Sequence, residues 1–478
     1  MPLKTGEEYI AGLKDGRVLY LNGKRIPDVT EDPVLGVGVR HAALDYVLAE
    51  DPKNSEICLG KSEVTGHPIS RYFQIPRTAE DLLARHRLID FGTRKGNGYV
   101  IFIKEIGTDT LFTLIQICRL IDRELGTEYF KRAMDFWQYC SENDLAMVGA
   151  ITDVKGDRSK RPSEQSDPDM YLRIVEKRSD GIVVRGAKTH TTAGPFCNEI
   201  LVTPTRALKE GDEDYAVAFG IQANTKGVIL MARPQERKDP FEFPQTSKNC
   251  LSETTTIFDN VFIPWERVFL CGEWKYAGLM ANTFANWHRF TGLSYKGPQA
   301  DLLLGSAQLI AEYNGVPDAS HIRSKIGQLI TYVTTIRVFA KASALECKIF
   351  EEVAFPHPLL INMGKHYFAD NYHTMIKHVQ EIAGGSVVTA PSADDWRNPE
   401  LSPYIEKYFK GIDGVPTEHR LRAFKLIKDM TASDEAGVWF LGTLHGEGSL
   451  EAQRITTYRE ADLSPYVKFA KEVAGIEG

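Results

Sequence analysis

The sequence feature that most limits the fold is a block of short β-rich segments set between two long helical stretches. Within residues 146–275, runs such as DGIVVRGAKTH, DYAVAFGI and TTTIFDNVFIP are separated by Gly, Asp, Asn and Pro, as expected of a β-barrel or sandwich. Residues 1–145 and 276–478 instead place apolar residues at helical spacing, although Asn22-Gly23 is typical of a β-hairpin. The sequence therefore predicts an α+β chain with an N-terminal mainly helical domain (1–145), a central β domain (146–275) and a C-terminal helical bundle (276–478).

Charge and composition limit the classes of partner. The chain has 478 residues, enough for several domains, and its formal net charge of −7 argues against a nucleic-acid or anionic-membrane binder. Its first residues carry charges inside every apolar run, and later apolar runs are too short for a membrane helix, so we expect a cytoplasmic protein that acts on a small molecule. The seven cysteines are scattered and odd in number, which suits reduced thiols and provides no closely spaced pair for a metal site.

One polar loop stands out where the first helical stretch gives way to strands. The segment AITDVKGDRSKRPSEQSDPD, residues 150–169, concentrates charges, one glycine and two prolines. Its backbone amides, Arg158 and Ser159 are suited to an anionic or multiply hydrogen-bonded cofactor, since a guanidinium group binds phosphate. A solvated interdomain loop is the alternative, and composition alone favours it.

Two further candidate positions lie in the β-rich block. Thr191 and Thr192 follow the run GIVVRGAKTH and are suited to donate hydrogen bonds to a cofactor ring, although they are equally typical of ordinary strand residues. Glu253 begins an apolar strand and is a candidate proton carrier, or else it ends a loop.

The second helical stretch contains a histidine and a late glycine-rich loop. His288 and Tyr295 in WHRFTGLSYK are seven residues apart and share a helix face, with Lys296 slightly aside. A lone helical histidine is more often structural than catalytic, but these neighbours favour a functional role. In LHGEGSLEAQR, Gly446 and Gly448 permit close approach of a ligand or simply connect two helices. Neither a Walker A nor a GxGxxG motif is present, so a conventional nucleotide-binding α/β domain is not supported.

Taken together and in order, the stretches YIAGLKDGRVLYLNGKRI, TDVKGDRS, DGIVVRGAKTH, FDNVFIPWERVF and HGEGS resemble a known flavoprotein family. This family includes 4-hydroxyphenylacetate 3-monooxygenase (large component) and 4-hydroxybutyryl-CoA dehydratase, and the resemblance is closer to the dehydratase branch. It implies an acyl-CoA-dehydrogenase-like fold, assembly as a homotetramer and FAD as the cofactor. It also implies flavin contacts from two segments, namely Thr152, Lys155, Gly156, Asp157, Arg158 and Thr192, and then His445, Gly446, Glu447, Gly448 and Ser449.

The chain departs from the dehydratase branch at its metal site. That branch holds an iron–sulfur cluster with three cysteines and a histidine. By resemblance His288 matches the histidine, whereas Tyr295 replaces one cysteine and residues 93–111, where the other two are expected, contain none. We therefore expect no iron–sulfur cluster and no metal. Gly292 and Gly442 replace an expected tyrosine and an expected glutamate.

The monooxygenase branch is also matched in part. Its substrate-facing Arg-x-x-x-Tyr corresponds here to Lys95 and Tyr99, which retain the capacity to bind an anion or a phenol. Gly149 replaces its catalytic histidine, and this removes the group that would orient or deprotonate a phenol.

The leading hypothesis is an FAD enzyme without an iron–sulfur cluster. It would act on an acyl-CoA-like or aromatic acid by flavin-assisted proton abstraction, in a lyase, isomerase or oxidoreductase step. His288 would serve as general base or acid with Glu253 as its partner, while Tyr295 and Lys296 would stabilise a developing anion or reduced flavin. The substrate would contact Lys95, Tyr99 and Phe290, with Trp287 lining the same space. The alternatives are a phenol monooxygenase supplied with reduced FAD by a separate flavin reductase, and an inactive scaffold that kept the fold.

Overall fold

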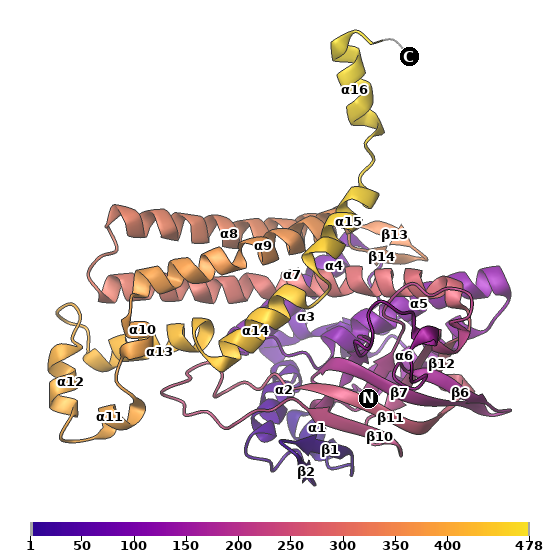
Figure 1. Ribbon diagram of the computed structural model, residues 1–478, viewed down its shortest axis with the longest axis horizontal. Helices are drawn as coiled ribbons and strands as arrows, with labels where there is room; N and C mark the ends of the chain where they lie inside the picture. The colour runs from indigo at the N-terminus through magenta and orange to yellow at the C-terminus, as the bar shows by residue number, and fades with distance from the viewer. Residues whose placement is uncertain (1–2, 477–478) are drawn as a thin grey trace.

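The computed structural model describes residues 3–476, without the side chains of residues 440, 441 and 443. Its elements follow the predicted order of helices, strands and helices (Figure 1). The first part comprises α1 Gly6–Gly12, β1 Val18–Leu21, β2 Lys24–Ile26, α2 Leu35–Glu50, α3 Ser55–Cys58, β3 Leu59–Lys61, β4 Pro68–Ser70, α4 Ala79–Lys95, α5 Glu105–Leu125 and α6 Tyr129–Glu142. The central strands are β5 Met147–Ala150, β6 Arg173–Lys177, β7 Gly181–Thr192, β8 Glu199–Val202, β9 Val217–Gln222, β10 Val228–Ala232, β11 Glu253–Pro264 and β12 Val268–Cys271.

The last part is mainly helical. Its elements are α7 Trp274–Tyr313, α8 Ser320–Leu345, β13 Lys348–Phe350, β14 Val353–Phe355, α9 Pro358–Ala383, α10 Ser386–Thr389, α11 Ala393–Arg397, α12 Ser402–Tyr408, α13 Thr417–Thr431, α14 Asp434–His445, α15 Leu450–Glu460 and α16 Ser464–Ala474. The long helices α7, α8 and α9 lie side by side as a bundle next to the sheets (Figure 1).

The central strands form a two-sheet sandwich. One sheet has the order β2-β1-β10-β11-β7-β6 and the other has the order β12-β9-β8-β5. Phe219 of β9 meets Phe258 of β11 edge to face, with ring centroids 5.7 Å apart, so the two sheets share one apolar core. The predicted sandwich is confirmed. The barrel alternative is wrong for the described residues, because their strands pair within two separate open sheets.

The N-terminal hairpin joins the larger sheet. Asn22 and Gly23 both have positive φ, 49° and 76°, and they connect β1 to β2 as the sequence predicts. Strand β1 then pairs in parallel with β10, more than two hundred residues away in the chain. The first helical part is therefore hydrogen-bonded to the central sandwich as well as packed on it.

Helix α5 lies between the bundle and the smaller sheet. It contacts α7 on one side and β5 on the other, and its residues from Glu105 to Cys118 are all buried. A polar side chain on α5 therefore needs a partner inside the protein. This placement brings residues of α5 to the start of α7.

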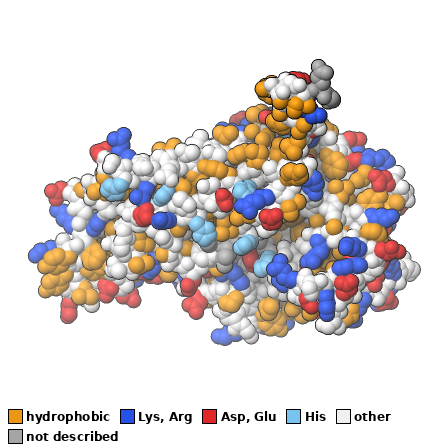
Figure 2. All heavy atoms as spheres, turned by 45° about the horizontal axis from the view of Figure 1, so that its top comes forward, with side chains coloured by type: hydrophobic (Ala, Val, Ile, Leu, Met, Phe, Trp, Pro, Cys, Tyr) orange, Lys and Arg blue, Asp and Glu red, His pale blue; other side chains and the backbone are white. Residues whose placement is uncertain are grey.

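Helix α16 stands off from the rest of the chain (Figure 1). Each of its residues is exposed, including the apolar side chains of Tyr466, Phe469 and Val473. Hydrophobic side chains accordingly gather on this projecting segment in the space-filling view (Figure 2). Over the part of the chain that the structure describes, no helix is long and apolar enough to cross a membrane.

Candidate active site

His288 lies near the start of α7 and is bound by a buried carboxylate. Its Nδ1 is 3.1 Å from Oδ2 of Asp109 on α5, and its ring stacks on Phe284 with 5.4 Å between centroids. A carboxylate only accepts hydrogen bonds, so Nδ1 carries the proton and Nε2 retains a lone pair. The side chain is 13% exposed, which leaves part of the ring accessible. A histidine oriented in this way by a carboxylate is chemically capable of accepting a proton at Nε2.

Asp109 is itself held by two other helices. Its Oδ1 accepts hydrogen bonds from Arg85 of α4 at 2.7 Å and from Thr291 of α7 at 2.9 Å, and its side chain is fully buried. Sequence patterns did not indicate this residue, and Glu253 was the expected partner of His288. A usable signal was present, since Asp109 is the single charge in the buried run GTDTLFTLIQIC, and a lone buried charge requires a partner.

Glu253 lies elsewhere, at the start of β11. Its Oε2 is 3.5 Å from Nδ1 of His190, and its backbone pairs with Thr192 on β7. Glu253 therefore pairs with His190, and its expected pairing with His288 is wrong.

Tyr295 and Lys296 share an unexpected partner, the carboxylate of Glu447. Tyr295 donates to Oε1 at 2.5 Å, and Nζ of Lys296 donates to the two oxygens at 2.5 and 2.8 Å. Nζ of Lys365, on α9, lies 3.9 Å from the same carboxylate. Burial alone would raise the pKa of Glu447, but the positive charges of Lys296 and Lys365 outweigh burial and lower it. Tyr295 and Lys296, which the sequence predicts as stabilisers of a developing anion, thus already bind the carboxylate of Glu447.

Gly292 makes room for this carboxylate. A Cβ at position 292 would lie 2.5 Å from Cδ, Oε1 and Oε2 of Glu447, which is too close for any real contact. Glu447 itself has φ of 62°, a backbone conformation that costs energy for a residue with a side chain and that concentrates at functional sites. Its carbonyl oxygen accepts a hydrogen bond from Nε of Arg289, which fixes the loop against α7. The glycine at position 292 therefore leaves room for the Glu447 carboxylate in its present position.

The two predicted cofactor segments lie in different surroundings. The hydrogen bonds of residues 444–449 run to α7, α9 and α15, with Lys365 donating to the Leu444 carbonyl and Gln453 to the Gly448 carbonyl. Residues 152–159 follow β5 and are mostly exposed. Among the described contacts, none joins the two segments within one chain.

The polar loop after β5 is ordered by its own contacts. Asp153 pairs with buried Lys188 at 2.6 Å, Tyr171 donates to the Lys155 carbonyl, and Gln165 accepts from the Asp157 amide. The guanidinium group of Arg158 is exposed, and it makes no ion pair with any described residue. An exposed guanidinium group on an ordered loop suits a polyanionic cofactor.

Backbone strain marks the end of β7. His190 and Ala193 have φ of 56° and 59°, and they flank Thr191 and Thr192. The Thr191 hydroxyl is fully buried and accepts from Thr256, so it does not face a ligand. Thr192 is partly exposed and remains a candidate for cofactor contact.

The predicted substrate residues are separated by the fold. Tyr99 lines a pocket, and its ring centroid is 4.6 Å from that of Trp439. Lys95 is exposed and lies over the ring of Phe91, outside this pocket. Phe290 is buried in the helical core, as is Trp287, whose Nε1 donates to Gln116. These two rings do not line the predicted substrate space because they fill the contact between α7 and its neighbours.

A metal cluster does not fit beside His288. About two helical turns after the histidine on α7, where the resemblance places a cysteine ligand, Tyr295 and Lys296 bind the carboxylate of Glu447, so the groups there are one phenol, one ammonium and one carboxylate. Within residues 3–476 no group of three or more His, Cys, Asp or Glu side chains is placed to hold a metal ion. The phenol, ammonium and carboxylate form a buried ion pair and do not supply the thiolate ligands of an iron–sulfur cluster.

Two family models match nearly the whole chain. Residues 5–270 match 4-hydroxyphenylacetate 3-hydroxylase N terminal, and residues 277–475 match 4-hydroxyphenylacetate 3-hydroxylase C terminal. The chain is 31% identical to the 4-hydroxybutyryl-CoA dehydratase/vinylacetyl-CoA-Delta-isomerase of Clostridium aminobutyricum, over 99% of this chain and 100% of that protein.

Solved structures from both branches have the same fold. An oxygen-tolerant archaeal 4-hydroxybutyryl-CoA dehydratase from N. maritimus is 33% identical, with a TM-score of 0.94 over 100% of this chain and 96% of that one. The oxygenase component of 4-hydroxyphenylacetate 3-monooxygenase complexed with FAD is 26% identical, with a TM-score of 0.89 over 98% of each chain.

Proposed function

The chain belongs to the 4-hydroxyphenylacetate 3-hydroxylase family, and from that membership we propose that it is an FAD-dependent enzyme in which His288 moves a proton of an acyl-CoA-like or aromatic acid substrate. Its relatives are enzymes, and their names cover dehydration with isomerisation on one branch and aromatic monooxygenation on the other. The proposal places this chain nearer the first branch, without the iron–sulfur cluster.

The residues after β5 and at the end of β7 fit a flavin. The exposed guanidinium group of Arg158, the exposed loop residues around Gly156, and Thr192 beside a strained backbone are the groups we assign to it. When bound there, FAD would accept or return an electron pair. Since residues 445–449 lie against α7 of their own chain, contact between that segment and a flavin held after β5 would involve another copy, as in the homotetramer that we propose.

The pairing of Asp109 with His288 is the observation that carries the proposal. With Nδ1 protonated and bound to Asp109, Nε2 is free to take a proton from a substrate carbon. The buried carboxylate of Asp109 would then stabilise the imidazolium, while Arg85 and Thr291 keep that carboxylate in place. Lys296 already balances the charge of Glu447, so the two side chains together are neutral. Lys296 would therefore stabilise a developing substrate anion only through the closeness of its ammonium group.

Isotope exchange tests this role directly. FAD-loaded protein is incubated in D₂O with 4-hydroxybutyryl-CoA or vinylacetyl-CoA, the compounds in the name of the Clostridium relative, and deuterium in the recovered acyl chain is measured by mass spectrometry. We expect exchange that the His288→Gln variant loses while it still binds FAD. Normal exchange by His288→Gln would remove the proposed base.

A second candidate, phenol hydroxylation with reduced FAD from a separate reductase, is favoured by one observation. The pocket beside Tyr295 is lined by the aromatic rings of Tyr99 and Trp439. Against it, Gly149 stands where the resemblance places a catalytic histidine, and a Cβ there would lie 2.8 Å from the hydroxyl oxygen of Thr110, so a larger residue would need this side chain to shift. Oxygen uptake with chemically reduced FAD and 4-hydroxyphenylacetate, coupled to a catechol product, would favour this candidate over the first.

A further inference from the structure

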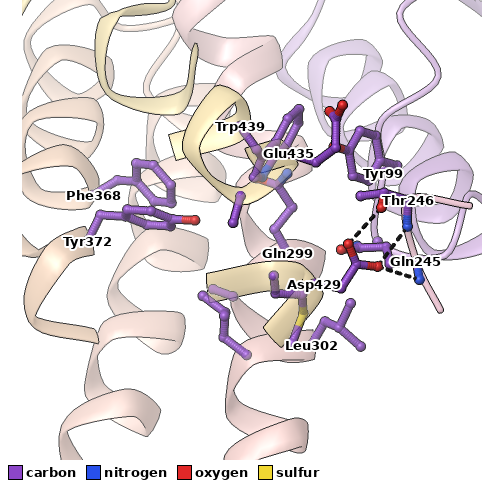
Figure 3. A pocket seen from close by; sticks show the side chains of 15 residues that line it. Tyr99, Gln245, Thr246, Gln299, Leu302, Phe368, Tyr372, Asp429, Glu435 and Trp439 are labelled. Atoms are coloured by element: carbon purple, nitrogen blue, oxygen red, sulfur yellow. Dashed lines mark hydrogen bonds between the residues drawn. The ribbon is translucent and has the colours of Figure 1, made fainter. Parts of the chain in front are cut away.

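An inner cavity lies between α7, α9, α13 and α14, and its walls include the rings of Tyr99, Phe368 and Trp439 (Figure 3). The ring centroid of Trp439 is 6.4 Å from that of Tyr295, so the inner cavity adjoins the ion pair described above. Its volume is about 20 Å³, which holds about one water molecule. The inner cavity is therefore closed to a substrate, and part of its wall must move before a substrate can bind beside Tyr99.

An outer cleft adjoins one wall of the inner cavity. It has a volume of about 320 Å³ and is lined by residues around the start of α2 and by parts of the segment 233–252. Its lining includes exposed side chains such as Arg40 and Arg237, so the outer cleft opens to solvent. Thr246 and Glu435 line both the outer cleft and the inner cavity, and they therefore belong to the wall that separates the two.

This wall is part of a long loop between β10 and β11. Residues 233–252 contain no helix or strand. Phe241 packs into a small apolar cluster with residues of α11, α12 and α13, and Arg233 donates to the Leu251 carbonyl at 2.8 Å. Both ends of the segment 243–250 are therefore fixed. Loops of this length without secondary structure are uncommon and are often active-site lids.

Hydrogen bonds hold the segment 243–250 in place. Its buried residues are all polar, namely Gln245, Thr246 and Asn249. Oδ2 of Asp429 on α13 accepts from the backbone amides of Gln245 and Thr246, both at 2.9 Å, and Oδ1 accepts from the Thr246 hydroxyl at 2.6 Å (Figure 3). A segment that buries few apolar side chains opens locally at a lower free-energy cost than the core.

Two buried polar atoms oppose the closed position. The hydroxyl oxygen of Ser247 and Oδ1 of Asn249 have no hydrogen-bond partner among the described residues. Burial of an unpaired polar atom is unfavourable, and movement of the segment would expose both atoms to water. The three hydrogen bonds to Asp429 favour the closed position. The closed and open positions are therefore closer in free energy than these three bonds alone would make them.

We propose that residues 243–250 form a lid that Asp429 holds closed, and that opening of this lid admits the substrate to the space beside Tyr99 and Tyr295. The lid would move about its two fixed ends and carry Thr246 away from Asp429, which joins the outer cleft to the inner cavity. The inference rests on the proposed function only for what enters the cavity. Its test uses no substrate, so a failure of the proton-transfer mechanism would leave the result readable.

The experiment measures how fast a small thiol reagent reaches the inner cavity. Ala300 is 1% exposed and lines this cavity, so Ala300→Cys places a thiol there. The full chain loaded with FAD is treated with iodoacetamide, and peptide mass spectrometry gives the alkylation rates at position 300 and at the native Cys118. Cys118 is fully buried on α5, so its rate reports unfolding of the whole chain.

Two variants weaken the closed lid, and a third is the control. Asp429→Ala removes all three hydrogen bonds to the lid, and Thr246→Val removes the hydroxyl bond alone. Asp212→Ala is the matched control outside the lid. Asp212 is also a buried carboxylate that accepts from a hydroxyl, that of Ser163 at 2.6 Å, and from two backbone amides.

We expect Asp429→Ala to speed alkylation at position 300 by about ten-fold or more, and Thr246→Val by about three-fold or more, with Cys118 unchanged. Asp212→Ala should leave the rate at position 300 unchanged. The proposal is overturned if neither lid variant raises the rate at position 300, or if the rise follows that of Cys118 or is matched by Asp212→Ala. Alkylation at position 300 as fast as that of a model thiol in solution, with the lid unmodified, would also overturn it, because the inner cavity would then be open without lid movement.

Discussion

Replacing Gly292 by alanine should displace the Glu447 carboxylate from its present position. The added Cβ would lie 2.5 Å from three atoms of that carboxylate, far inside contact distance. The backbone of α7 is fixed by its own hydrogen bonds, so the carboxylate must move. The ion pair with Lys296, whose side chain is fully buried, would then lengthen and weaken.

The size of the effect follows from two opposing contributions. Breaking a buried ion pair by removing one partner costs about 3–5 kcal/mol. Alanine in place of glycine inside a helix returns about 1 kcal/mol. Complete loss of the pair would therefore lower the free energy of unfolding by about 2–4 kcal/mol, which is the upper limit that we expect for Gly292→Ala. Gly305→Ala is the matched control, because it lies on the same helix with nothing within 4 Å of its Cβ, and it should be neutral or stabilising.

Urea unfolding followed by circular dichroism measures both variants. A double-mutant cycle isolates the contact, since in a Glu447→Ala background the extra methyl of Gly292→Ala has no carboxylate to displace. The destabilisation by Gly292→Ala should then disappear. If Gly292→Ala is as stable as Gly305→Ala, or destabilises equally in both backgrounds, the proposed steric dependence between positions 292 and 447 is wrong.

Three further outcomes are expected. Asp109→Asn should reduce proton exchange by about 10²–10⁴-fold through its effect on His288, measured by the D₂O assay, while FAD affinity stays unchanged. Burial lowers the pKa of His86 from 6.5 to about 4, so its contribution to stability is intact above pH 6.5 and is lost as the pH falls towards 4. His86→Gln should flatten the stability curve in that window by about 3 kcal/mol, measured by urea unfolding at successive pH values, and a parallel curve would contradict this. Arg158→Ala should weaken FAD binding about ten-fold in a fluorescence titration without changing the unfolding midpoint. Lys160→Ala, the control, should leave both the FAD affinity and the unfolding midpoint unchanged.

Local sequence patterns were sufficient for the order of the elements and for the family. The alternation of Gly- and Pro-bounded β runs with helical spacing predicts the sandwich between two helical parts, and Asn22-Gly23 predicts the hairpin. The motifs TDVKGDRS and HGEGS carry the resemblance that the family models confirm. Each of these signals spans about a dozen residues or fewer, which is the range over which backbone propensity acts.

Contacts between distant residues were beyond that range. Asp109 and His288 are 179 residues apart, and neither local segment shows that α4, α5 and α7 converge. The same holds for Glu447 and Lys296, which are 151 residues apart. The family resemblance implied that Glu447 belongs among the cofactor residues. The structure shows that its side chain meets α7, because the charge of Lys296 must be balanced inside the protein.

Helix α16 makes the stability of one chain depend on what covers its apolar side chains. Tyr466, Phe469 and Val473 keep their apolar side chains in water, where each loses the benefit of burial. In the proposed homotetramer, another copy would cover them. Mass action then makes the melting temperature rise with protein concentration, and dilution alone would weaken a chain whose own contacts are unchanged. Stability comparisons between variants of this protein are therefore meaningful at one fixed protein concentration.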